Sequence, residues 1–154
     1  FEQQNADFSL ALNGDASAPG FAQVVEQYGN TPAGNLAKMY AAACSLRLGE
    51  FDQAQSYISS FKNVKGVPGE IINAMAAGIK AEIAVEKKDY AKAATLFEQA
   101  AKLSENDFTT PMYLRKAALV YKQLGQEEKA KEIYKTIKES YSSSYDAREA
   151  EKNL

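Results

Sequence analysis

The sequence predicts an all-α fold: a right-handed α-solenoid of about three helical hairpins, with an N-terminal helical segment before them and a C-terminal capping helix after them. The main observation is an internal repeat, in which small residues are followed by a short turn and then by an alanine. That alanine recurs as Ala54, Ala93 and Ala130, at separations of 39 and 37 residues. A period of this length is typical of stacked hairpins, because each hairpin can bury its apolar face only against its neighbours. The second observation is apolar spacing at i, i+3, i+4 and i+7, which indicates helices.

The N-terminal helical segment covers residues 1–33 and holds one clear amphipathic helix. Apolar residues recur there at helical spacing, at Phe21, Val24, Val25 and Tyr28. Gly29 follows the last of them, which predicts the end of this helix.

The three hairpins are expected at residues 35–62, 70–103 and 111–140. Gly and Pro residues in 63–69 predict a loop between the first two hairpins, and a polar stretch at 104–110 predicts a second loop.

Hydroxyl residues mark several helix starts. Thr31 precedes Pro32 and Thr110 precedes Pro111, which is the pattern of an N-cap followed by a proline at the first helical position. The run Ser142-Ser143-Ser144 offers a hydroxyl N-cap for the final helix, within residues 144–154. The charged side chains of that helix make the end of a solenoid soluble.

Length and composition fit one domain over residues 1–154 and exclude several functions. There are 18 basic and 20 acidic residues, a net charge of -2, so the chain lacks the positive field that gathers nucleic acid. It has no His and a single Cys, Cys44, which excludes Ser-His-Asp catalysis and an ordinary His/Cys zinc site. The glycines form no phosphate-binding loop. We therefore assign no catalytic, cofactor-binding or metal-binding residue, and no run of residues is apolar enough to insert into a membrane.

The repeats resemble the tetratricopeptide repeat family. The third unit matches best, with apolar, small, aromatic and turn positions filled by Leu114, Ala117, Ala118, Tyr121, Gly125, Ala130 and Tyr134. The first unit supplies Ala41, Ala42, Gly49, Phe51, Ala54 and Ile58, and the second supplies Ala81, Asp89, Tyr90, Ala93, Phe97 and Ala100. Three positions depart from the family pattern: Ser45 in place of an aromatic residue, Lys88 in place of the turn Gly, and Ser142 in place of the Pro expected between units. The resemblance covers about residues 35–142 and implies a non-enzymatic scaffold or adaptor that binds a protein or peptide.

A narrower likeness concerns four segments: Leu12-Asn13-Gly14-Asp15, Tyr28-Gly29-Asn30-Thr31, Gly34-Asn35-Leu36-Ala37-Lys38 and Asn106-Asp107-Phe108-Thr109-Thr110-Pro111. They resemble bacterial envelope tetratricopeptide proteins that carry one N-terminal transmembrane anchor, some of which are related to ancillary translocon subunits or chaperone-like factors. The likeness implies a periplasmic domain anchored to the inner membrane by an N-terminal segment absent from this sequence. A cytoplasmic location is the alternative.

The resemblance also implies a binding groove, because the first helix of each tetratricopeptide unit lines the concave face where peptides lie. The residues expected in this groove are Met39, Ala43, Leu46, Arg47, Glu82, Glu86, Arg115, Leu119 and Lys122. Leu46 and Leu119 are the expected apolar contacts, and the charged residues are expected to set the register of the partner. The expected ligand is a helical or extended segment with mixed apolar and charged side chains.

Two other functions stay open at this point. The exposed apolar residues of the repeats are also compatible with self-association into a structural or assembly element, and the sequence leaves the oligomeric state undetermined. Glu82 and Glu86 are four residues apart on one helical face, so a carboxylate-based enzyme is a third, less favoured, hypothesis.

Overall fold

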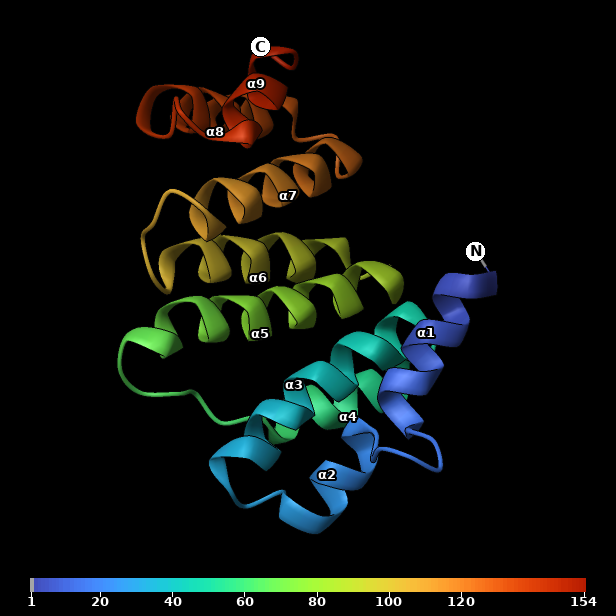
Figure 1. Ribbon diagram of the computed structural model, residues 1–154. Coiled ribbons are helices and arrows are strands. Elements are labelled where there is room, and N and C mark those ends of the chain that lie inside the picture. Colours follow the sequence, from blue (N-terminus) through green and yellow to red (C-terminus); the bar gives the residue numbers. More distant parts are fainter. Residues whose placement is uncertain (1) are drawn as a thin grey trace. The chain divides into compact units, whose positions relative to one another are not determined.

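The structure, a computed structural model, describes the backbone of residues 2–154, and every regular element in that part of the chain is a helix (Figure 1). This confirms the all-α fold class. The chain forms two compact units, residues 1–62 and residues 63–154, and each is described by itself. The expectation of one domain over residues 1–154 stays a prediction.

The first unit is organised around its longest helix. Its four helices are α1 (Glu2–Asn13), α2 (Phe21–Tyr28), α3 (Pro32–Arg47) and α4 (Phe51–Ser60). The third of these packs against each of the other three, and the core contains Leu12, Ala41 and Cys44. Thr31 caps α3 as predicted, because its hydroxyl accepts a hydrogen bond of 3.1 Å from the backbone N–H of Gly34.

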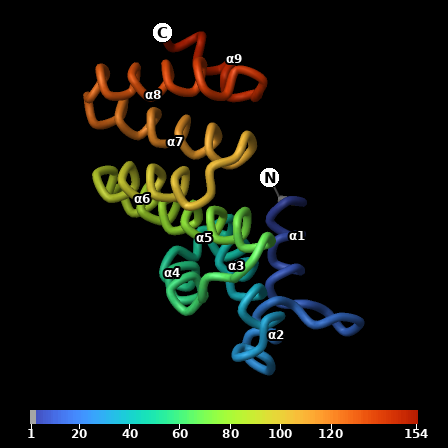
Figure 2. The backbone as a smooth tube through the Cα atoms, turned by 90° about the vertical axis from the view of Figure 1, so that its left-hand side faces the viewer, coloured from blue at the N-terminus to red at the C-terminus, as the bar shows by residue number. Residues whose placement is uncertain are grey.

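The second unit is a stack in which each helix packs against the next. Its helices are α5 (Val67–Glu86), α6 (Tyr90–Lys102), α7 (Thr109–Gln123), α8 (Glu127–Ser140) and α9 (Tyr145–Glu151). Figures 1 and 2 show α5, α6, α7 and α8 as successive layers. The core of this unit is one cluster in which alanines, such as Ala81, Ala93 and Ala117, lie where helices approach closely. Large side chains, such as Phe97 and Tyr134, fill the remaining space.

The turn inside each hairpin uses one residue with a positive φ angle. That residue is Gly49 (φ 80°), Lys88 (φ 61°) or Gly125 (φ 71°). Glycine adopts this conformation at no steric cost, whereas a residue with a Cβ atom is sterically strained in it. The sequence already marked Lys88 as the exception, and the structure shows that the lysine takes the glycine conformation instead of changing the turn.

Two helix starts differ from those predicted. The first helix of the second hairpin begins at Val67 and not near residue 70, since Pro68 fits in the first helical turn. The first helix of the third hairpin begins at Thr109, one residue before the predicted cap. The hydroxyl of Thr110 does not cap the helix there: it donates to the backbone oxygen of Ala101 at 3.2 Å and accepts from the backbone N–H of Asn106 at 3.0 Å. By contrast, Ser144 caps α9 as predicted, accepting from the backbone N–H of Ala147 at 3.1 Å.

Candidate functional site

Polar contacts connect α7 with α5 and with α9 in the second unit. Lys116 on α7 forms an ion pair with Glu82 on α5. The Nε atom of Arg115 on α7 lies 2.5 Å from Oδ1 of Asp146 on α9. These contacts fix the positions of charged groups along one side of the stack.

One face of α7 carries the residues that make these contacts. Met112, Arg115, Leu119 and Lys122 follow one another at intervals of three or four residues, and Lys116 is the neighbour of Arg115, so all five share one side of the helix. Leu119 is 47% exposed. The Nζ atom of Lys122 donates to Oδ1 of Asn153 at 3.2 Å. An exposed aliphatic side chain therefore lies among cationic groups that already have partners.

The facing side of α5 follows the same spacing. Ile71, Met75, Gly78, Glu82 and Glu86 are three or four residues apart, and Glu82 places this side toward α7. Ile71 is 46% exposed and Met75 is 36% exposed. Glu86 is exposed at the end of the helix. We name the two sides together the first-helix surface: Ile71, Met75, Glu82 and Glu86 on α5 with Met112, Arg115, Lys116, Leu119 and Lys122 on α7.

A buried aromatic pair lies beside Lys116 of this surface. The rings of Tyr113 and Phe97 are stacked with their centroids 6.3 Å apart. The Nζ atom of Lys116 lies 5.8 Å from each centroid, within the range of cation–π attraction. Burial, and secondarily the nearby charge of Glu82, raises the pKa of the Tyr113 phenol, which therefore stays neutral at physiological pH. Gly78 makes room for the ring, since a Cβ atom there would overlap it.

Asp146 is a buried acid whose position is determined by two neighbours. Its side chain is 10% exposed and that of Arg115 is 29% exposed. The Ser144 cap starts α9 and so places Asp146 in its first turn. A buried carboxylate is costly unless it is paired, so Arg115 contributes to the packing of α9 as well as to the surface.

The predicted groove residues of the first unit are placed differently from those of the second. The side chains of Met39 and Leu46 are buried, with 1% and 7% exposure, because the neighbouring helices cover α3 on several sides. Ala43 is half-buried and Arg47 is exposed. In this conformation Met39 and Leu46 pack within the protein and leave little surface for a partner. Their role in partner binding stays a prediction.

The sequence reasoning missed several residues of this site. Lys116 and Asp146 were not predicted as groove residues, although they hold two of the predicted residues in place. The repeat period did not point to Lys116, because it follows Glu82 by 34 residues, whereas the equivalent alanines of these two units, Ala93 and Ala130, are 37 residues apart. The two exposed residues Ile71 and Met75 were also missed, because periodicity indicates the direction of a side chain but not its depth.

The two carboxylates of the enzyme hypothesis, Glu82 and Glu86, lie in different surroundings. Glu82 is engaged by Lys116, while Glu86 is exposed one turn further along α5. No group of three or more His, Cys, Asp and Glu residues suitable for a metal ion occurs among the side chains of residues 3–154. No helix in that same range is long and apolar enough to cross a bilayer.

Comparison with known protein families gives two matches, both to models of the tetratricopeptide repeat. One covers residues 76–107 and the other residues 113–144. They correspond to the second half of α5 with α6, and to most of α7 with α8, so each falls within one helical hairpin. The matches support the tetratricopeptide repeat family, whose repeats generally mediate protein–protein interaction and whose members are generally non-enzymatic. Comparisons with curated proteins and with solved structures gave no significant match.

Proposed function

We propose that this protein is a non-enzymatic scaffold or adaptor that binds a segment of another protein on the first-helix surface. The observation that supports the proposal is the exposure of Leu119 between charged residues that are held in place. Arg115 and Lys116 each have an acidic partner, so the charges near Leu119 are ordered before a partner arrives. Ordered contacts lower the entropic cost of binding.

The surface favours a partner with mixed chemistry. Leu119, Met75 and Ile71 offer separate aliphatic contacts, and a partner that covers them gains from the burial of apolar area. Lys122 and Glu86 are exposed at the margin, where charges contribute more to specificity and association rate than to affinity. We infer that the partner segment is helical or extended and presents aliphatic side chains with charges of both signs beside them.

Site-specific photocrosslinking in cells tests this proposal. A photoreactive amino acid is introduced at Leu119 and, as a matched control, at Thr95, which is exposed on α6 outside the first-helix surface. We expect a defined crosslinked protein from position 119 and not from position 95, and loss of that product when Met75→Glu is added. The same product from both positions would contradict a binding site on this surface.

Self-association is the second candidate, and the exposed aliphatic residues on α5 are the observation that favours it. Three large apolar residues, Val67, Ile71 and Met75, recur every four residues and are exposed, so a second copy could cover them. Sedimentation equilibrium over a range of protein concentrations distinguishes this candidate. A concentration-dependent dimer that is lost in Ile71→Glu would favour assembly over the scaffold function.

We also propose that the protein works at the bacterial cell envelope, as a periplasmic domain held at the inner membrane by an N-terminal anchor, with a chaperone-like role. The resemblance of its sequence to membrane-anchored envelope proteins supports this proposal. Protease treatment of intact spheroplasts that express the natural full-length protein tests it. We expect degradation of the domain at the outer side of the inner membrane, whereas protection in the cytoplasm would contradict the proposal.

A further inference from the structure

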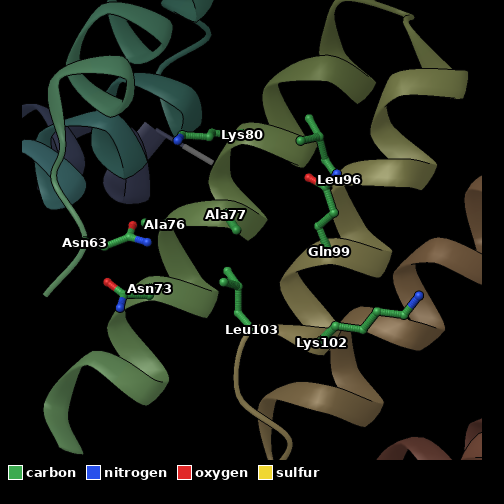
Figure 3. Close-up of a pocket in the computed structure, with 9 residues that line it drawn as sticks. All are labelled: Asn63, Asn73, Ala76, Ala77, Lys80, Leu96, Gln99, Lys102 and Leu103. Carbon is green, nitrogen blue, oxygen red and sulfur yellow. The ribbon is translucent and has the colours of Figure 1, made fainter. Parts of the chain in front are cut away.

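A cavity of about 430 Å³ lies between α5 and α6 (Figure 3). Lys80 lines it and Glu82 does not. These two residues are two positions apart on an α-helix, which places them about 200° apart around the helix axis. The cavity and the first-helix surface therefore occupy opposite sides of α5. Its volume is in the lower part of the range of small-ligand sites.

The floor and walls of the cavity are apolar. Ala76 and Ala77 contribute the side of α5, and Leu96 and Leu103 contribute the side of α6. The alanines are small and leave the space that the cavity occupies. Leu103 is 47% exposed. An aliphatic side chain that entered the cavity would cover these leucines and gain about 25 cal/mol for each Å² of apolar surface removed from water.

The rim of the cavity carries positive charge and amides but no acid. Lys80 and Lys102 line it, and so do the amides of Asn63, Asn73 and Gln99. Figure 3 shows the two lysine side chains leaving the cavity on opposite sides, Lys80 from α5 and Lys102 from α6. The nearest ion pair of Lys102, to Glu98, is 4.0 Å long with the lysine side chain 76% exposed, so water weakens it strongly. The apolar floor thus has a cation on either side.

One edge of the cavity is ordered by the protein itself. The side-chain amide of Asn73 bonds to the backbone of Val64 in both directions, with the backbone N–H donating at 2.8 Å and the backbone oxygen accepting at 2.9 Å. These two hydrogen bonds have the pattern of the backbone hydrogen bonds between paired strands, and they attach the segment before α5 to the helix. Asn63 is consequently held at the rim without the aid of a ligand.

From this arrangement we propose that the α5–α6 cavity is a second docking site, and that its ligand is an acidic peptide segment that inserts an aliphatic side chain. The aliphatic side chain occupies the space between Ala77, Leu96 and Leu103. Acidic residues before and after it meet Lys80 and Lys102, and Gln99 donates to the peptide. A basic segment would meet two like charges and no acid, which disfavours it. The proposal goes beyond the scaffold function, since it assigns a second ligand to another face of α5.

Peptide titration followed by amide NMR of the full chain tests this site. The probe is a capped hexapeptide with two central leucines and two acidic residues on either side. The comparison peptide has the same leucines and basic residues in place of the acidic ones. We expect the acidic peptide to shift the resonances of Ala77, Leu96 and Leu103, and the basic peptide to leave them unchanged.

Three variants show where the peptide binds. Lys80→Glu is expected to weaken binding of the acidic peptide at least about tenfold. Lys92→Glu makes the same charge change at an exposed position of α6 that does not line the cavity, and it is expected to have little effect. Leu119→Glu alters the first-helix surface alone and is expected to leave this affinity unchanged, so failure of one site is distinguishable from failure of the other.

Several results would overturn the proposal. One is absence of binding by the acidic peptide, and another is equal binding by both peptides. A third is equal weakening by Lys80→Glu and Lys92→Glu, which would indicate a general charge effect. Shifts at the same residues that depend on protein concentration without peptide would show a second copy in the cavity and would also overturn it. Circular dichroism of each variant confirms that the helices are retained.

Discussion

Replacement of Gly78 by alanine tests most sharply how α5, α6 and α7 pack under the first-helix surface. A Cβ atom at residue 78 would lie 2.3 Å from Cε1 of Tyr113 and 2.5 Å from its Cζ and Oη atoms. Such distances are well below van der Waals contact. The ring has little room to withdraw, because it is 4% exposed and stacked on Phe97. The substitution therefore forces either the ring or α5 to move.

The expected magnitude follows from two opposing effects. Replacement of a glycine by alanine in the middle of a helix stabilises the helix by about 1 kcal/mol. Addition of a methyl group to a packed core costs about 1–3 kcal/mol, and overlap with three atoms of the Tyr113 side chain places Gly78→Ala in the upper part of that range. We expect the free energy of unfolding to fall by about 1–2 kcal/mol as the sum of these effects.

Urea denaturation followed by circular dichroism measures this change, in the natural background and in a Tyr113→Leu background. Without the ring the steric cost disappears and the helix propensity remains, so Gly78→Ala should then stabilise by about 0.5–1 kcal/mol. The reversal of sign between the two backgrounds is the decisive observation. The same effect in both, or stabilisation in the natural background, would refute the proposed contact between Gly78 and the ring.

Three further predictions concern other parts of the protein. Lys88→Gly should stabilise by about 0.5–1 kcal/mol in urea denaturation, because glycine adopts the positive φ of 61° without steric cost; destabilisation would contradict this account of the turn. Asp146→Ala should lower the free energy of unfolding by about 1–3 kcal/mol. This is less than the loss for a fully buried ion pair, because Arg115 is partly exposed. A double-mutant cycle with Arg115→Ala measures the coupling, and strict additivity would show that the pair contributes nothing. Burial raises the pKa of Tyr113, so the folded state favours the neutral phenol. The stability that Tyr113 contributes is therefore complete below the ordinary phenol pKa of about 10 and is lost as the pH rises above that value. The free energy of unfolding of Tyr113→Phe should therefore fall less than that of the natural protein between about pH 9 and pH 11. Equal falls would show that ionisation of Tyr113 does not cause the loss.

Local features of the fold were predictable because neighbouring residues determine them. The cap of α3 by Thr31 and that of α9 by Ser144 need only a hydroxyl residue and a few backbone N–H groups that follow it. The hairpin turn at Gly125 needs only a residue that tolerates a positive φ. Thr110 shows the limit of such reasoning, because its hydroxyl bonds to Ala101, nine residues before it.

The candidate site was only partly predictable, because its contacts join distant residues. The sequence indicated that Glu82 and Arg115 lie on first helices, but not that Lys116 and Asp146 hold them. Helical periodicity places side chains around one helix axis, whereas burial depends on all the helices that cover it. For this reason Leu119 could be predicted as a surface residue while the burial of Met39 could not. The α5–α6 cavity had no sequence signal, since small residues beside leucines are equally typical of a core.

The affinity of the partner segment for the first-helix surface is the most direct test of the central claim. The segment identified by crosslinking is synthesised and titrated calorimetrically against the natural protein, Leu119→Glu and Thr95→Glu. If the surface binds this segment, Leu119→Glu should weaken binding at least about tenfold, since a charge would replace a buried apolar contact. The Thr95→Glu control should bind like the natural protein. Equal affinity of all three proteins would contradict the claim and would place partner binding elsewhere on the molecule.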